Sequence, residues 1–289
     1  MITVLYEDNH LLVVNKPTGV ATMGEEGDDR EVSVHRWGCD YVRRKYGKPG
    51  RVYLGVVHRL DRVTSGVLVL ARTSKAAARL SEQFRREGTA RGGAESGERK
   101  GVAGRGDGEA GDGLGDGPEK VYLAVTRGGK GQSGAIVPSQ GTMRDWVIKN
   151  ERAQRMEVAR QVGLVPPAGA ADAVLEYRSL RRGKDRHGRP IELVRVDLKT
   201  GRKHQIRLQF AHRGHPIDGD RKYGGDGSGG GERTSQGGVL GGGEREEIGL
   251  HAWRLSLWHP VAKKRMTWVA PVPESWGRRY AQLMPWPVE

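Results

Sequence analysis

The chain has 289 residues, with 49 Lys and Arg against 35 Asp and Glu, a formal net charge of +14 and a sequence pI near 10.1. Its one cysteine, Cys39, excludes an internal disulfide framework and a cysteine-rich zinc site, so we expect the reducing environment of the cytoplasm. The longest apolar run, residues 67–71, is far shorter than the roughly 20 residues that cross a bilayer. The N-terminus also lacks the basic and apolar regions of a signal peptide, so we expect no membrane association.

Two glycine-rich segments interrupt the pattern of a folded chain. Residues 88–117 contain 12 glycines and residues 224–243 contain 11, and neither segment has apolar residues at a regular spacing. Such segments bury too little surface to offset the entropy lost on ordering, so both are predicted to be disordered. We predict a single domain over residues 1–289, with insertions at about 87–119 and 225–248.

Both insertions are acidic, so the rest of the chain is more basic than its total charge indicates. The insertions carry net charges of −4 and −3, which leaves +21 on the other 232 residues. A folded surface of this charge creates a positive potential that attracts polyanions. Nucleic acid is therefore the first partner to consider.

The first 86 residues predict three strands and two helices. The strands are apolar runs rich in β-branched residues, at positions 11–14, 52–57 and 67–71. Apolar residues at helical spacing predict a helix over 32–46, with Gly47 as its cap, and another over 75–86 that Ser74 caps.

The second half of the chain predicts more strands than helices. The strands fall at 121–125, 191–198, 250–258 and 265–270. In residues 203–213 the apolar positions fit both the spacing of a strand and that of a helix. The length of this segment and Gly214 after it favour a helix. The region up to about residue 173 looks irregular. Five of the seven Trp residues follow residue 250, which predicts that the core closes there. Because no alternation of strand and helix typical of parallel units is visible, we predict an α+β fold.

The segment His58-Arg59-Leu60-Asp61-Arg62 places one carboxylate between two arginines, where two apolar strands meet. The neighbouring cations favour the ionised form of Asp61, which can then act as a nucleophile or a base. On spacing alone, a surface ion pair between Arg and Asp is the commoner outcome.

Other polar segments are less specific. Residues 200–207 form a second basic cluster whose glycine allows close approach of a ligand, but a solvated basic face is an equally good interpretation. A metal site around residues 215–220 is less expected than a simple Asp-Gly turn. The glycine pattern at 225–230 lacks the strand and helix of a dinucleotide site, and the sequence contains no phosphate-loop or serine-hydrolase motif.

Several segments in order resemble the RluA-type family of pseudouridine synthases, over nearly the whole chain outside the insertions. The matching segments are 5–8, 11–19, 58–61, 64–69, 120–125, 200–207, 214–217, 219–220, 250–252 and 259–260. Many members of the family carry an additional N-terminal S4-like domain that binds RNA. This chain begins with the segment that resembles the catalytic core, so we expect the catalytic domain only.

The resemblance implies a pseudouridine-synthase fold, with a mixed, mostly antiparallel sheet flanked by helices and an active-site cleft across it. It also implies an isomerase that cuts the bond between uracil and ribose in RNA and rejoins the ribose to uracil C5, without cofactor or metal. Asp61 matches the essential aspartate and Tyr122 the active-site tyrosine. By position, Arg207 matches the cation that keeps a buried Asp61 charged, with Arg202 as the alternate.

The resemblance and the charge together imply how RNA is held. The target base must leave its stack to reach such a pocket, and Arg59 matches a family arginine thought to fill the vacated place. Lys203 stands where the family often has Ser or Thr, which adds a positive charge. We expect ribosomal rather than transfer RNA as the substrate, and a monomeric protein. The predicted RNA-binding residues are Arg59, Arg62, Arg202, Lys203, His204 and Gln205.

Two other classes of function stay open on the sequence. A non-catalytic RNA-binding or chaperone protein could keep the same scaffold, but it would not need all three predicted catalytic residues. A metal-dependent nuclease would use Asp218, Asp220 and His215, because clustered carboxylates bind Mg²⁺.

Overall fold

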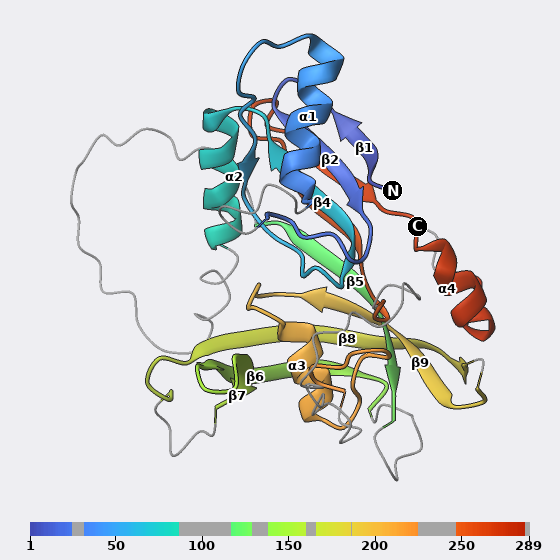
Figure 1. Cartoon of the computed structure of the whole chain (residues 1–289). Helices are drawn as coiled ribbons and strands as arrows, with labels where there is room; N and C mark the ends of the chain where they lie inside the picture. Colours follow the sequence, from blue (N-terminus) through green and yellow to red (C-terminus); the bar gives the residue numbers. More distant parts are fainter. Residues whose placement is uncertain are drawn as a thin grey trace, which may run out of the picture.

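The computed structural model of the chain describes residues 1–24, 32–86, 117–128, 138–159, 166–185, 187–224 and 247–286 (Figure 1). The strands within these ranges are β1 (Thr3–Glu7), β2 (Leu11–Lys16), β3 (Gly55–Val56), β4 (Ser65–Ala71), β5 (Glu119–Arg127), β6 (Gln140–Asn150), β7 (Arg155–Val158), β8 (Ala171–Lys184), β9 (Pro190–Leu198), β10 (Leu250–Trp258) and β11 (Arg265–Val269). The helices are α1 (Val34–Tyr46), α2 (Ser74–Arg86), α3 (Gln205–His212), α4 (Glu274–Arg279) and the short 3-10 helix η1 (Ala281–Leu283).

All of these strands belong to one sheet. Its order is β1-β2-β4-β10-β5-β9-β8-β6-β7, with β11 paired to β10 and β3 paired to β4. The pairings are antiparallel except that of β4 with β10, which is parallel. A mixed, mostly antiparallel sheet with few helices confirms the predicted α+β class.

The parallel contact between β4 and β10 requires a glycine. Gly66 has a φ of +120°, and a Cβ at this position would lie 2.1 Å from the carbonyl oxygen of Ala252. No side chain fits this approach, because the clash is with backbone. The contact lies a few residues after Asp61, so it helps to fix the segment that carries this carboxylate.

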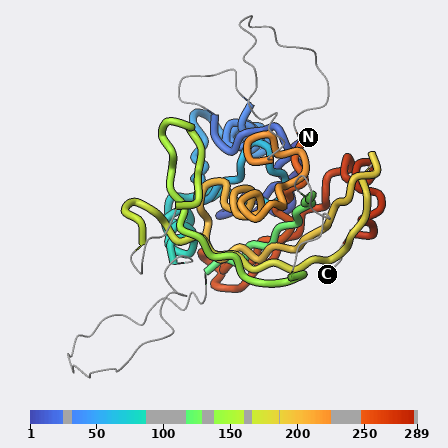
Figure 2. The backbone as a smooth tube through the Cα atoms, turned by 90° about the horizontal axis from the view of Figure 1, so that it is seen from below, coloured from blue at the N-terminus to red at the C-terminus, as the bar shows by residue number. Residues whose placement is uncertain are grey.

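Apolar side chains cover both faces of the sheet at β2 and β4. One cluster contains Leu12, Val14, Leu68 and Leu70 with Val34 and Val42 of α1. The other contains Leu11, Val13, Val67 and Val69 with Ala76 and Leu80 of α2. Because both faces are covered, these strands read as uninterrupted apolar runs. The first cluster also holds Tyr122 of β5 and Phe210 of α3, so α1, α3 and Tyr122 share one face of the sheet. Figure 2 shows the yellow strands β8 and β9 running beside the orange α3.

The ends of the two N-terminal helices follow from capping. The predicted helix over 32–46 is confirmed as α1, where Ser33 accepts a hydrogen bond from the backbone N–H of Arg36 and Gly47 adopts a left-handed conformation. Ser74 was predicted to cap the next helix, which is wrong. Ser74 begins α2, and the hydroxyl of Thr73 accepts the N–H of Ala76.

The central region is more regular than the sequence predicted. Residues 140–158 form β6 and β7, and β8 begins at Ala171. The apolar alternation is broken here because β6 turns a charged residue inward: Asp145 is bound by Gln209 and Arg213. Conversely, the predicted strand over 52–57 is reduced to the two residues of β3.

Three C-terminal Trp residues are buried, Trp253, Trp268 and Trp276, which confirms that the core closes in this part of the chain. The predicted disorder of the insertions lies outside the described residues. The described residues resume at 117 and 247, before the predicted ends of the insertions at 119 and 248. Glu119 begins β5, and Ile248 is buried. In the part of the chain that the structure describes, no helix is long and apolar enough to cross a membrane.

Candidate active site

A cavity of about 420 Å³ opens where the segment before β4, strand β5 and the start of α3 meet. Its volume falls in the range of about 300–1,000 Å³ typical of small-molecule sites. Residues from five parts of the sequence line it: 57–64, 84–85, 120–122, 198–207 and residue 250. They include His58, Arg59, Asp61, Phe84, Lys120, Tyr122, Arg202, His204, Gln205 and Arg207.

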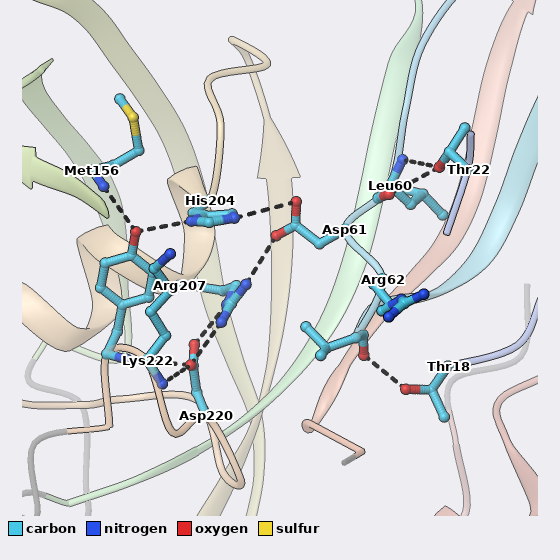
Figure 3. A network of polar contacts seen from close by, with 12 residues as sticks. Thr18, Thr22, Leu60, Asp61, Arg62, Met156, His204, Arg207, Asp220 and Lys222 are labelled. Carbon is cyan, nitrogen blue, oxygen red and sulfur yellow. Dashed lines mark hydrogen bonds and ion pairs between the residues drawn. The ribbon is translucent and has the colours of Figure 1, made fainter. Parts of the chain in front are cut away.

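Asp61 presents its two carboxylate oxygens to two residues near the start of α3. Nη1 of Arg207 donates a hydrogen bond to Oδ2 at 3.2 Å, and Nε2 of His204 lies 3.8 Å from Oδ1. All three side chains line the cavity, and that of Asp61 is the most accessible of them at 22% exposed, against 11% for His204 and 7% for Arg207. Figure 3 shows Asp61 with His204 and Arg207 on one side and Arg62 on the other.

Residues 16–22 bind the backbone of residues 60–63, the segment that contains Asp61. Thr22 exchanges hydrogen bonds with both backbone groups of Leu60, and the hydroxyl of Thr18 donates to the carbonyl of Val63. The ammonium of Lys16 is fully buried and donates to the carbonyls of Pro17, Val20 and Arg62. Burial lowers the pKa of Lys16 to about 7, and the charge of Asp61 opposes this shift.

Arg207 is fixed by a second carboxylate. Its Nε and Nη2 donate to the two oxygens of Asp220 at 2.7 and 2.8 Å, and the side chains of Arg207 and Asp220 are 7% and 0% exposed. Burial by itself lowers the pKa of Arg207, but the hydrogen bonds and charges of Asp220 and Asp61 outweigh it and raise the pKa. Two of the three nitrogens are therefore held by Asp220, which leaves Nη1 directed at Asp61.

His204 adopts an uncommon backbone conformation. It stands at the N-cap of α3 with a φ of +57°, in the left-handed region, and its side chain makes no capping hydrogen bond. A residue with a Cβ pays roughly 1–2 kcal/mol there. The ring instead contacts the hydroxyl of Tyr223, with Nδ1 at 2.9 Å, and reaches Asp61 with Nε2. Strain at a cavity wall is a recognised mark of a functional position.

Tyr122 lies on the strand at the centre of the sheet. Its neighbours across the strands are Val196 of β9 and Ala252 of β10, and it is 9% exposed. Lys120 is two residues earlier and lines the same cavity. Successive residues of a strand alternate between faces, so these two side chains share the cavity face.

The predicted RNA-binding residues differ in placement. Arg59, Arg62 and Lys203 are exposed, and Arg202 is exposed while its Nε donates to the carbonyl of Asp172. Gln205 is buried and its amide is used internally. The amide oxygen accepts from the Thr200 hydroxyl and the Arg202 N–H, and the amide nitrogen donates to the carbonyl of Val174. Gln205 therefore closes the turn that leads into α3.

His58, the first residue of its motif, has a structural contact. Its Nε2 accepts the backbone N–H of Val69, and its ring stacks on Phe84 of α2 at 4.7 Å between centroids. Burial lowers the pKa of His58 to about 3, with the charge of Lys120 acting in the same direction. The imidazole is therefore neutral at physiological pH, and it binds a backbone N–H of β4.

The sequence did not single out three residues of this region: Lys16, Lys120 and Tyr223. Lys16 lies in the matching segment 11–19 and Lys120 in the matching segment 120–125, but the motifs gave neither residue a role. Nothing in the sequence ties Tyr223 to the site, because its partners His204 and Met156 are distant in the chain.

The carboxylates considered for a metal site have other partners. Asp220 is bound to Arg207, and Asp218 accepts hydrogen bonds from Arg279 and the Tyr280 hydroxyl. Over the described ranges, no three His, Cys, Asp or Glu side chains gather where they could hold a metal ion. The two aspartates thus serve different arginines.

The sequence and the fold that bring Asp61, Tyr122 and Arg207 together are similar to those of known proteins. The family model described as RNA pseudouridylate synthase matches residues 10–91 and 114–212, more than half of the chain. The chain belongs to this family. As an RNA pseudouridylate synthase, it is an isomerase that converts uridine in RNA to pseudouridine, which confirms the activity and the family predicted from the sequence motifs.

Individual relatives cover nearly all of this pseudouridine synthase. The ribosomal large subunit pseudouridine synthase D of Xylella fastidiosa is 32% identical over 98% of this chain and 69% of its own length. The tRNA pseudouridine synthase C of Pasteurella multocida is 30% identical over 95% of this chain and 93% of its own length. Among solved structures, human RNA pseudouridylate synthase domain containing 4 has a TM-score of 0.64 at 23% identity, over 97% of this chain and 92% of that one. This last likeness concerns the fold.

Proposed function

We propose that this synthase modifies uridine in ribosomal RNA and that Asp61 is its catalytic carboxylate. The observation that carries the assignment is the contact between Asp61 and Arg207 in a cavity that Tyr122 also lines. A charged carboxylate is needed beside the ribose, either to attack it or to remove a proton from it. Arg207 supplies the opposite charge, and Asp220 holds Arg207 in place.

Tyr122 is proposed to contact the uracil. Its ring gives an apolar surface for the flat base while the base is detached, and its hydroxyl can assist removal of the proton from C5. Rejoining the ribose at C5 replaces the hydrogen there. Release of that hydrogen is therefore a direct measure of turnover.

RNA is proposed to lie over the exposed arginines at the cavity rim. Arg59 would fill the place that the extruded base leaves, while Arg62, Arg202 and Lys203 would bind phosphates. Each phosphate contact contributes about 0.7 to the slope of log affinity against log salt for single-stranded RNA. Arg202→Ala should therefore reduce the magnitude of this slope by about 0.7.

The relatives support ribosomal RNA over transfer RNA, because the large-subunit synthases D and C are repeated among them. A tRNA synthase of similar identity makes transfer RNA the competing substrate. The two substrates can be distinguished by which RNA lacks pseudouridine when the gene is deleted.

The test is to map pseudouridine in total RNA from the source organism with and without this gene. We expect a position in large-subunit ribosomal RNA to lose its pseudouridine, and to regain it with the wild-type gene but not with Asp61→Asn. A lost position in transfer RNA instead would overturn the substrate while keeping the activity. Purified Asp61→Asn enzyme should bind RNA within a few-fold of wild type, and any turnover by it would refute the role of Asp61.

A further inference from the structure

A chain of three groups leads from strand β7 to the carboxylate of Asp61. The backbone N–H of Met156 in β7 donates to the hydroxyl of Tyr223 at 3.1 Å. That hydroxyl lies 2.9 Å from Nδ1 of His204, and Nε2 of the same ring lies 3.8 Å from Oδ1 of Asp61. Figure 3 shows His204 between Met156 and Asp61 along this line.

Two contacts of the His204 ring favour the tautomer with its proton on Nε2. The Tyr223 oxygen already accepts one N–H, so its single hydrogen is available for Nδ1 of the ring. A ring that accepts at Nδ1 carries its proton on Nε2. The opposite tautomer would direct a lone pair of Nε2 at a carboxylate oxygen, which is repulsive. Both arguments place an N–H against Oδ1 of Asp61.

The two oxygens of Asp61 are thus divided between two residues of one helical turn. Arg207 takes Oδ2 and His204 faces Oδ1, at positions i and i+3. Tyr223 supports both of them, because the guanidinium of Arg207 lies 5.3 Å from the centre of its ring. The left-handed backbone at His204 is what directs the imidazole into this contact instead of into a helix cap.

We propose that His204, oriented by Tyr223, is a positioning residue that sets the rotation of the Asp61 carboxylate through its neutral Nε2–H. The proposal rests on the role of Asp61 given above. It replaces the direct contact with RNA predicted for His204, whose side chain is only 11% exposed. The separation of 3.8 Å is longer than a hydrogen bond, and we expect it to shorten when substrate closes the cavity.

A neutral ring suits this task. Burial lowers the pKa of His204 to about 4, Asp61 opposes the shift, and the nearby Arg207, Lys222 and Lys203 reinforce it. A protonated ring would add a second cation at Asp61 and compete with Arg207 for its charge. The hydroxyl of Tyr223 works in the same direction, because it occupies the nitrogen that protonation needs.

The first test uses Tyr223→Phe, which removes the hydroxyl and keeps the ring under Arg207. The substrate is total RNA from a strain that lacks the gene, labelled with tritium at uracil C5, and single-turnover tritium release gives the rate. We expect the rate to fall by about 10- to 100-fold, as for a misplaced catalytic group, with the Kd for RNA within about threefold. The loss should be the same at pH 8 and at pH 6, because burial keeps the His204 ring neutral over this range in both proteins.

Two further variants separate positioning from folding. His204→Asn keeps a residue that tolerates the left-handed backbone but is too short to reach Asp61, and it should lose at least as much rate as Tyr223→Phe. Tyr177→Phe is the matched control: Tyr177 also packs against α3, through Phe210, and its hydroxyl donates to the carbonyl of Pro138 away from the cavity. This control should keep the wild-type rate.

The inference is overturned if Tyr223→Phe and His204→Asn both react at the wild-type rate, if their defect lies in the Kd for RNA alone, or if Tyr177→Phe loses as much rate as they do. Asp61→Asn distinguishes this failure from that of the proposed function. If Asp61→Asn is inactive while the His204 and Tyr223 variants are normal, only the positioning role is wrong. If Asp61→Asn still turns over, the assigned catalytic residue is wrong as well.

Discussion

Asp220 is the buried counter-ion of Arg207, and its replacement by Asn tests whether Arg207 has to be held to orient Asp61. The carboxylate of Asp220 is fully buried and accepts two hydrogen bonds from the guanidinium and two from the backbone N–H groups of Lys222 and Tyr223. Asp220→Asn keeps the shape but removes the charge. Breaking a buried ion pair on one side costs about 3–5 kcal/mol.

This loss should be visible both in stability and in rate. For a chain of this size it lowers the melting temperature by about 6–20 °C, measured alongside urea unfolding. The single-turnover rate at a temperature where the variant is folded should fall by about 10- to 100-fold, because Nη1 of Arg207 is no longer aimed at Asp61.

Asp218→Asn is the matched control, because Asp218 is also a buried aspartate paired to an arginine, two residues away. Its partner Arg279 is 29% exposed and lies outside the cavity, so we expect a smaller loss of about 1–3 kcal/mol and an unchanged rate. Wild-type turnover by Asp220→Asn, or an equal loss of rate in Asp218→Asn, would refute the reasoning.

Three further predictions concern stability. Burial alone would raise the pKa of Glu7, but hydrogen bonds from Lys45, Tyr46 and Tyr41 outweigh it and lower the pKa from 4.5 to about 2. Glu7 therefore stabilises the fold above about pH 4.5 and loses this effect as the pH falls through 2, so the urea midpoints of wild type and Glu7→Gln should differ at pH 7 and converge only below about pH 2. Because burial lowers the pKa of Lys16 from 10.5 to about 7, the unfolded chain binds more protons between these values, and stability should rise with pH across this window in wild type but not in Lys16→Met. Gly66→Ala should prevent folding or lower the urea midpoint strongly, since its Cβ would meet the Ala252 carbonyl at 2.1 Å. Gly47→Ala, also at positive φ but with no atom within 4 Å, should cost only about 1–2 kcal/mol.

Local patterns in the sequence determined the elements whose stability is local. The helix over 32–46 follows from apolar spacing and its two caps, Ser33 and Gly47, all within one short segment. The motifs around Asp61, Tyr122 and Arg207 likewise identified the residues that line the cavity. Strand β6 was not predicted, because Asp145 breaks its alternation of apolar and polar residues. The partners of Asp145, Gln209 and Arg213, lie more than sixty positions away in the sequence.

The resemblance pointed to Arg207 as the cation of Asp61, with Arg202 as the alternate, but only the tertiary structure shows the contact itself. Arg59 and Arg62 are next to it in the sequence, yet both are exposed, while Arg207 reaches it from 146 positions away. The orientation of the Arg207 guanidinium depends in turn on its hydrogen bonds to Asp220. The tautomer inferred for His204 depends on the Tyr223 hydroxyl, which accepts a backbone N–H of β7. The sequence determines which side chains are present, but a contact between distant positions depends on the whole sheet, because it is the packing of β4, β5 and α3 together that brings these groups to one cavity.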